Sequence, residues 1–314
     1  MSQERTQQIK QASWVGILGN SLLAILKIVI GFISGSLAVV GDGIDSLSDV
    51  LTYIITLFTA RIISKPPDYK FPYGYRKAET ISTKVLSFII FFAGAQLLIS
   101  TIGRLIDNEP REMPSIIAIY VTVVSIFGKG ILAVWQFKIG KRINSAMIIA
   151  NAKNMRNDIL ISSSVLVGLV FTFVLEMPSL DLITAMLVSF WIIKVAWGIF
   201  KETNVELMDG VGDTDIYDKI FQATEEINGV SNPHRIRVRK LANLYLVAMD
   251  IEVDKNLQLF EAHELSKKVE CRLRELVPNI YDILIHIEPE GNVEEDEVYG
   301  ISKDIISNQN NKNV

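Results

Sequence analysis

The chain has 314 residues, of which 49% are hydrophobic and 21% are charged, and its mean hydropathy is +0.31. A net charge of −4 gives no indication of nucleic-acid binding, and a single cysteine, Cys271, excludes an intrachain disulfide framework. Long apolar runs fill the first two thirds of the chain and the rest is polar. This pattern predicts a membrane domain followed by a soluble domain.

Six apolar stretches are long enough to cross a bilayer, which takes about 20 helical residues. They run over residues 14–36, 37–61, 79–102, 114–137, 146–174 and 178–200. By hydropathy alone the fifth would start near Ile159, but an earlier start brings the polar cluster 151–158 into the helix. Basic residues gather between the second and third spans and between the fourth and fifth. The positive-inside rule therefore predicts that both termini are cytoplasmic.

The polar part of the chain predicts a small α+β unit. Helical periodicity over 213–227 is followed by strand-like alternation over 234–240 and a second strand over 245–253. An amphipathic helix over 261–276 and a strand over 281–287 complete an α-β-β-α-β order, which is ferredoxin-like. We expect a cytoplasmic N-terminal segment at 1–13, a six-helix transport domain at 14–203, a cytoplasmic domain at 204–289 and a disordered, acidic and Asn-rich tail at 290–314.

Two pairs of polar side chains lie inside the apolar spans. Asp45 and Asp49 are four residues apart in the second span, as are Asn154 and Asp158 in the fifth, so each pair shares one helical face. Carboxylates at membrane depth are costly and usually face a cavity or an ion path. Without an evident basic partner on those faces, the four oxygen ligands predict a divalent-cation site with a net charge of about −1 when loaded. The alternative is a set of interhelical hydrogen bonds.

Three further charges in the spans need an explanation. Asp42, one turn before Asp45, could be an accessory relay at the outer side of the site or a helix-entry residue, and we favour helix entry. Lys27 could pair with an interior acid or extend to the interface, and a structural role is expected. Asp181 begins the sixth span and is expected to be a helix-entry charge.

The motifs together resemble those of a known family, the cation diffusion facilitators, over about residues 10–289. The matching segments are Gly35-Ser36-Leu37-Ala38, Asp42-Gly43-Ile44-Asp45-Ser46-Leu47-Ser48-Asp49, Pro66-Pro67-Asp68, Lys77-Ala78-Glu79, Arg156-Asn157-Asp158, Ala262-His263 and His286-Ile287-Glu288-Pro289. The resemblance implies a homodimeric, proton-coupled exporter of divalent metals in a lipid bilayer, in this case expected in a bacterial inner membrane. The family's transport site maps onto Asp45, Asp49, Asn154 and Asp158.

The resemblance also implies two sets of accessory residues. Lys77 and Asp209 correspond to a salt-bridge network at the dimer waist, with generic surface charges as the alternative. Regulatory metal sites in the cytoplasmic domain would draw on a larger set, in which a purely structural histidine is the alternative for each position: His234, Asp250, His263, His286 and Glu288.

The absence of histidine from the four membrane positions bears on the metal. Zinc favours His and Cys, whereas oxygen-only sites suit harder cations, so the chain resembles the family's manganese-transporting branch. Fe²⁺, Co²⁺ and Zn²⁺ remain alternatives, and no resident cofactor is expected. In the loop after the second span, Phe71 and Tyr75 stand where the family often has histidines, so a zinc site using Asp68 is not expected.

Two other classes of function were weighed. A membrane-bound metal sensor or scaffold would need the cytoplasmic residues but not the membrane aspartates. An integral membrane enzyme is disfavoured, because the sequence contains no HExxH, GxSxG or phosphate-cradling glycine motif and no histidine near the membrane acids. We therefore predict that the protein is not an enzyme.

Overall fold

The computed structural model describes residues 3–107, 112–142, 146–212, 214–241, 244–292 and 300–302. The chain forms two compact units. The first comprises residues 1–64 and 82–200, and the second comprises 65–81 and 201–314. The loop between the second and third membrane helices therefore belongs with the C-terminal part of the chain.

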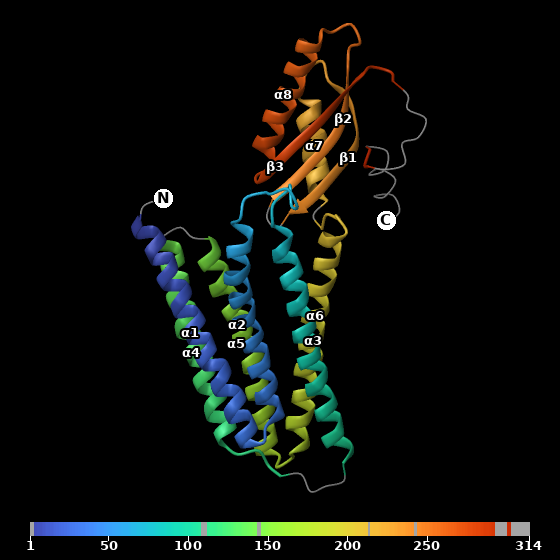
Figure 1. Ribbon diagram of the computed structural model, residues 1–314. Coiled ribbons are helices and arrows are strands. Elements are labelled where there is room, and N and C mark those ends of the chain that lie inside the picture. The colour runs from blue at the N-terminus through green and yellow to red at the C-terminus, as the bar shows by residue number, and fades with distance from the viewer. Residues whose placement is uncertain are drawn as a thin grey trace. The chain divides into compact units, whose positions relative to one another are not determined.

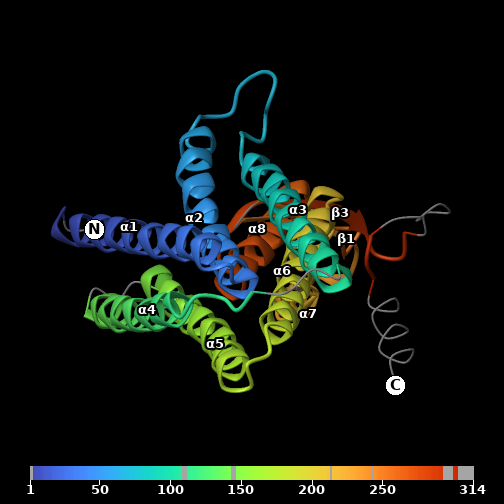
Figure 2. The ribbon, with the colours of Figure 1, turned by 90° about the horizontal axis from the view of Figure 1, so that it is seen from below.

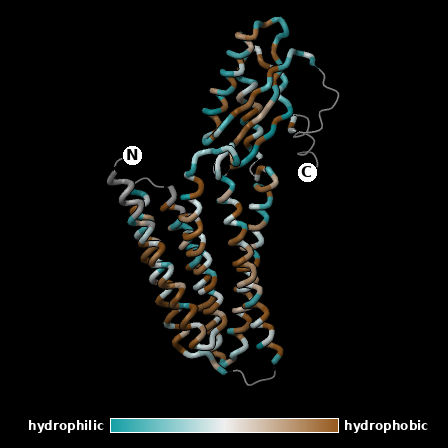
Figure 3. Tube along the Cα trace, in the orientation of Figure 1, coloured by the Kyte–Doolittle hydropathy of each residue, from teal (hydrophilic) through white to brown (hydrophobic). Residues whose placement is uncertain are grey.

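The six predicted membrane spans are confirmed as long helices (Figure 1). They are α1 (Gln3–Ser34), α2 (Leu37–Ile63), α3 (Lys77–Ile106), α4 (Ile117–Arg142), α5 (Ala146–Val174) and α6 (Ser179–Leu207). The colouring by hydropathy in Figure 3 shows that apolar residues predominate along them. The fifth helix begins at Ala146, so the polar cluster 151–158 is helical.

Four of the helices form a bundle, seen end-on in Figure 2. Helix α1 packs against α2 and α4, α4 packs along α5, and α2 contacts α5. Helix α3 lies beside α6, where Phe88 and Phe200 meet edge to face at 5.4 Å. The two helices that carry the predicted ligands, α2 and α5, are thus neighbours within the bundle.

A close approach of α1 to α2 depends on Gly43. A Cβ atom at this position would lie 2.6 Å from Ile28 Cγ1 and 3.0 Å from the Ile28 backbone nitrogen. A side chain here would push the helices apart, because a contact with backbone cannot be relieved by a rotamer change. The motif glycine between Asp42 and Asp45 is therefore explained by packing.

Asp181 connects the start of α6 to the start of α2. Its Oδ1 atom accepts a hydrogen bond from Ser36 Oγ at 2.5 Å and its Oδ2 atom accepts one from the Leu37 backbone nitrogen at 3.0 Å. A carboxylate is well suited to the unpaired N–H groups at a helix N-terminus. Asp181 does lie in the first turn of α6, as expected, but the helix it caps is α2.

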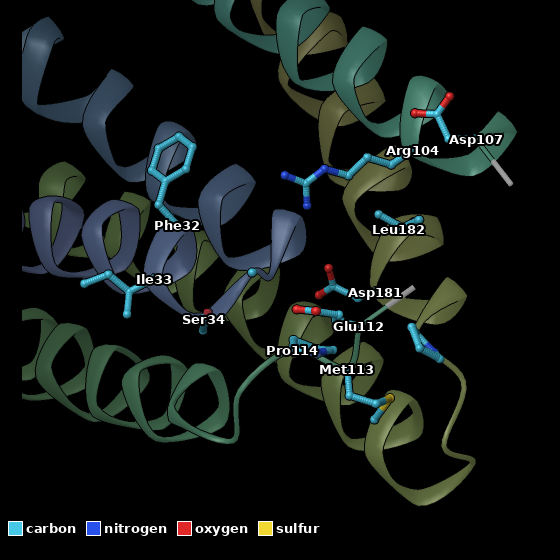
Figure 4. A pocket seen from close by; sticks show the side chains of 12 residues that line it. Phe32, Ile33, Ser34, Arg104, Asp107, Glu112, Met113, Pro114, Asp181 and Leu182 are labelled. Carbon is cyan, nitrogen blue, oxygen red and sulfur yellow. The ribbon is translucent and has the colours of Figure 1, made fainter. Parts of the chain in front are cut away.

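Asp181 also lies at a pocket of about 360 Å³ among the ends of α1, α3 and α6 (Figure 4). Arg104 of α3 and Glu112, which precedes α4, line the same pocket. Asp181 itself is only 3% exposed, so its hydrogen bonds to α2 are shielded from water.

The second unit contains the predicted α+β domain. Its elements are α7 (Asp215–Glu225), β1 (Ser231–Leu241), β2 (Leu244–Val253), α8 (Leu259–Leu276) and β3 (Ile280–Pro289). The sheet has the order β1-β2-β3, with β1 antiparallel to β2 and β2 parallel to β3. Alternate residues of the strands pack against the two helices and form the core, including Ile236, Met249 and Ile251.

Part of the C-terminal tail is ordered against the sheet. Ile301 pairs with Ile236 of β1 through two backbone hydrogen bonds, at 3.1 and 2.9 Å. Residues 300–302 thus differ from the expectation of a disordered tail, because the β1 edge offers unpaired backbone groups to a passing segment. Residues 293–299 and 303–314 lie outside the described part of the chain.

We expect Asp181→Ala to destabilise the membrane unit by about 1 to 3 kcal/mol, because Ser36 and Leu37 would keep buried donors without an acceptor. Thermal unfolding in detergent measures the change. Asp107→Ala is the matched control, because Asp107 lines the same pocket but its side chain is exposed. Equal unfolding temperatures for the two variants would contradict the capping role.

Candidate metal-transport site

The predicted ligands lie on α2 and α5, which contact each other. Asp45, Asp49 and Asp158 are half-buried, whereas Asn154 is exposed. Each i, i+4 pair therefore lies on one face of its own helix, as expected. The four side chains differ in exposure, because Asn154 is exposed and the three aspartates are half-buried.

The structure brings the carboxylates of the two helices together. Asp45 and Asp49 of α2 and Asp158 of α5 lie close enough to interact electrostatically across the contact between the two helices. Two carboxyl groups in contact repel each other unless a proton or a cation lies between them. The arrangement is therefore suited to holding a cation.

The expectation that these faces lack a basic partner is wrong. Lys129 Nζ of α4 lies 2.9 Å from Asp158 Oδ2, and the lysine side chain is only 1% exposed. Lys129 belongs to neither α2 nor α5 but to α4, the helix packed along α5. The sequence feature that indicates this pair is a lysine in the middle of the apolar span 117–142, because a lysine at membrane depth is costly unless an acid pairs with it.

A second buried cluster surrounds Lys27 of α1. Its ammonium nitrogen lies 2.8 Å from Asp42 Oδ2 and also contacts Ser46 Oγ at 3.2 Å and Ser162 Oγ at 2.9 Å. Ser162 in turn donates to Asp42 Oδ1 at 2.7 Å. These four residues connect α1, α2 and α5.

The Lys27 cluster corrects the interpretation of Asp42. Helix α2 begins at Leu37, so Asp42 lies more than one turn inside it and is not a helix-entry residue. Both Asp42 and Lys27 are almost completely buried, at 1% and 0% exposure. Lys27 pairs with an interior acid, which was one of its two expected arrangements. A relay role for Asp42 remains a prediction.

The loop between α2 and α3 uses its acid internally. Asp68 accepts hydrogen bonds from the Lys70 and Phe71 backbone nitrogens, both at 2.9 Å, and from the Tyr75 hydroxyl at 2.5 Å. The Tyr75 hydrogen bond, followed by the Phe71 one, holds the pKa of the Asp68 carboxyl below its usual value. Tyr75, at a position where the family often has histidine, thus binds the carboxylate directly.

A second candidate metal site lies on the three-stranded sheet. His234 of β1, Asp250 of β2 and Glu288 of β3 are buried, and one ligand atom from each lies within 4.8 Å of the others. His286 Nε2 lies 3.5 Å from Glu288 Oε1, but His286 is 64% exposed. Among the described residues this is the one group of three such side chains that is close enough for a shared ion, and the three membrane aspartates are more widely spaced.

The remaining predicted ligand, His263, is on α8 and exposed, outside the group of three on the sheet. Arg235 was not among the predicted residues, and its Nη1 atom lies 3.1 Å from Asp250 Oδ2. The sequence gives little indication of this contact, because it depends on irregular pairing of β1 near His234 and on a positive φ of 47° at Arg235.

The His234 ring is oriented for ligation. Its Nδ1 atom lies 2.7 Å from the Asn232 carbonyl oxygen, which can only accept a hydrogen bond, so Nδ1 carries the proton. Its Nε2 atom faces Glu288 Oε2 at 3.5 Å. Many metal-binding histidines are oriented in this way, because the ring nitrogen that does not bind the metal donates a hydrogen bond to a backbone carbonyl.

Lys77 and Asp209 form an ion pair of 2.6 Å within the second unit. Arg239 Nε approaches the other Asp209 oxygen at 3.4 Å, and Thr80 donates to Glu206 at 2.6 Å. The two residues expected to belong to a salt-bridge network are therefore paired within one chain. Their part in a dimer interface stays a prediction.

Six apolar helices, two of which carry paired polar residues, followed by an α+β domain, define an integral membrane protein of the cation-transporter class. The cation efflux transmembrane domain matches residues 13–208, and the cation efflux protein cytoplasmic domain matches residues 213–290. The chain belongs to the cation efflux family, the cation diffusion facilitators, as its motifs indicated. It is therefore a divalent-cation efflux transporter.

Several relatives are similar over most of their length. The manganese efflux system protein MneS of Bacillus subtilis is 30% identical over 289 residues, which cover 91% of this chain and 98% of MneS. The magnetosome protein MamB of a Magnetospira species is 28% identical, covering 84% of this chain and 89% of MamB. The metal-bound C-terminal domain of the CzcD transporter from Thermotoga maritima is 44% identical, covering 26% of this chain and 93% of that domain, with a TM-score of 0.25.

We expect Lys27→Met and Asp42→Leu, made singly, to destabilise the protein by about 3 to 5 kcal/mol each, because each leaves an uncompensated buried charge. The double variant Lys27→Met/Asp42→Leu removes both charges and is expected to regain most of that stability. Thermal unfolding of the three variants in detergent tests this. A double variant no more stable than the weaker single variant would show that the pair is not the source of the effect.

Proposed function

We propose that the protein exports Mn²⁺ from the cytoplasm in exchange for protons, through a site formed by Asp45, Asp49, Asn154 and Asp158. The observation that carries this proposal is the convergence of Asp45 and Asp49 of α2 with Asp158 of α5, on two helices that contact each other. In the family, export of a divalent cation is the established activity. The site residues supply the chemistry that such a cation requires.

The oxygen-only ligand set supports manganese. Carboxylate and amide oxygens suit hard divalent cations, whereas zinc sites are dominated by His and Cys. All three histidines of the chain lie after residue 230, away from the membrane spans. MneS is named as a manganese efflux protein, which supports the same choice. Fe²⁺ and Co²⁺ are the main alternatives and Zn²⁺ is a further one, because other relatives such as MamB and CzcD are not named for manganese.

Proton exchange follows from the same residues. Three carboxylates at membrane depth carry more negative charge than the one ammonium of Lys129 offsets, so they need further positive charge whenever the metal leaves. Since the site has no histidine, we assign proton uptake to Asp45, Asp49 and Asp158 themselves. Inward opening would load the metal, and outward opening would release it as protons bind.

The orientation and assembly complete the proposal. The basic loops after α2 and α4 support cytoplasmic termini, and the similarity to Bacillus subtilis MneS supports a bacterial cell membrane. The matched cytoplasmic domain is a dimerising one, which supports a homodimer. The salt-bridge residues Lys77 and Asp209 would then lie near the twofold axis.

Purified protein in liposomes with an imposed pH gradient tests the transport proposal. We expect Mn²⁺ flux that depends on the gradient and falls at least about 100-fold in Asp49→Ala, because the site loses a charged ligand. Asp107→Ala, a change in an exposed aspartate, is the control and should transport normally. Full flux in Asp49→Ala would overturn the site, and preferred transport of Zn²⁺ or Fe²⁺ would overturn the metal.

The cytoplasmic sheet supports a second, accessory metal site at His234, Asp250 and Glu288. The buried, oriented imidazole and two carboxylates within 4.8 Å favour it over a purely structural histidine. A metal there would compete with Arg235 for Asp250. His263 and His286 would be at most peripheral, since both are exposed.

Calorimetric titration of the full-length Asp49→Ala protein with Mn²⁺ or Zn²⁺ tests the accessory site without the transport site. We expect His234→Ala to weaken the remaining binding at least about tenfold, because losing even a group that only hydrogen-bonds to a metal ligand typically lowers metal affinity by that factor. His263→Ala should have no effect. Equal affinities with and without His234 would indicate a structural histidine, and retained binding without transport in the wild type would favour the sensor alternative.

A further inference from the structure

Lys129 is a buried cation placed directly on the transport site. It lies in the middle of α4, is 1% exposed, and its Nζ atom is 2.9 Å from Asp158 Oδ2 on α5. Among the described membrane residues, the other almost fully buried lysine is Lys27. Lys27 is neutralised by Asp42 and hydrogen-bonded by two serines, so its charge is balanced outside the predicted metal site.

The cost of burying an ammonium group at this depth argues for a specific purpose. A lysine in the membrane interior is retained only when an acid compensates it, and a buried pair is rarely a net gain in stability over apolar side chains. The acid that compensates Lys129 is a predicted metal ligand. A lysine used only to hold helices together would serve equally well beside an acid that has no other task, as Lys27 does beside Asp42.

We propose that Lys129 is a positioning residue of the transport site, which holds one carboxylate oxygen of Asp158 and supplies the charge that makes the metal-loaded site neutral. The inference rests on the proposed transport site but not on which metal it carries.

The charge balance supports this role. Three ionised aspartates and one ammonium carry a net charge of −2, which a divalent cation cancels. Without Lys129, the loaded site would keep a net charge of −1. Because the surroundings have a low dielectric constant, a neutral loaded site costs less to close off from water than a charged one.

The geometry supports it as well. Lys129 contacts Oδ2 of Asp158, and a carboxylate has a second oxygen that can still face a metal. Asp158 is on α5, which contacts both α4, the helix of Lys129, and α2, the helix of Asp45 and Asp49. An outer-shell partner that fixes the rotamer of a ligating carboxylate in this way commonly changes metal affinity and activity when it is removed.

The test is the initial rate of transport against metal concentration in proteoliposomes, for the wild type and for Lys129→Met, Lys129→Gln and Lys129→Arg. With one positive charge removed, we expect KM to fall about tenfold or more in Lys129→Met, because the site attracts the cation more strongly. Turnover is expected to fall at least about tenfold, because the loaded site is charged and releases the metal slowly. Lys129→Arg keeps the charge and should retain both constants within about threefold.

Lys138→Met is the matched control, because Lys138 is an exposed lysine of the same helix. Both constants should be unchanged in this variant. If Lys129→Met does not give monodisperse protein, Lys129→Gln is the test variant, because its amide can still donate to Asp158 but carries no charge. The same fall in KM and turnover is expected there.

Two results would overturn the inference. One is a Lys129→Gln or Lys129→Met protein with wild-type KM and turnover. The other is a parallel loss of turnover in Lys129→Met and Lys129→Arg with no fall in KM, which would indicate a packing role. A wild type that does not carry Mn²⁺ would refute the proposed metal alone. The ratio of variant to wild type would then be measured with the divalent cation that is transported.

Discussion

The membrane unit is built around one constraint: a charge buried in a low-dielectric interior must find its compensation within the chain. Lys27 meets Asp42 at 2.8 Å, and Lys129 meets Asp158 at 2.9 Å. These two pairs connect α1 to α2 and α4 to α5, and together they join the four helices that pack as a bundle. Asp45 and Asp49 have no lysine of their own at such a distance among the described residues, and with Asp158 they are the acids of the proposed cation site.

The two pairs differ in their surroundings, and only the Lys129 pair includes a residue of the proposed transport site. The Lys27 cluster is closed, because Ser46 and Ser162 complete the hydrogen bonding around Lys27 and Asp42. The Lys129 pair is open, because Asp158 also interacts electrostatically with Asp45 and Asp49 across the α2–α5 interface. A closed cluster fixes helix positions, whereas an open one can exchange partners. The proposed transport cycle would use both, since the bundle would have to hold together while the ligands change partners.

In the cytoplasmic unit, acids are also paired within the chain, but most of these pairs are more exposed to water. Asp68 is stabilised by Tyr75 within its own loop, Lys77 pairs with Asp209, and Arg235 pairs with Asp250. Among the residues that the structure describes, only the group of His234, Asp250 and Glu288 brings three such buried side chains within 4.8 Å of one another. Water reaches most of this unit, so its ion pairs contribute less to stability than the buried ones do.

The sequence by itself determined the elements and the ligand types. Span length and hydropathy identified all six membrane helices, and periodicity gave the α-β-β-α-β order, because both depend on local composition and spacing. The i, i+4 spacing placed Asp45 with Asp49 and Asn154 with Asp158. The pairing of charges was decided by tertiary structure. Lys129 and Asp158 are 29 positions apart, and Lys27 and Asp42 belong to different helices, so only packing shows which charges neutralise each other. The contact of Ile301 with β1 and the capping of α2 by Asp181 could not be predicted for the same reason. Each joins segments that are far apart in the sequence, and local composition and spacing do not indicate which distant segments meet.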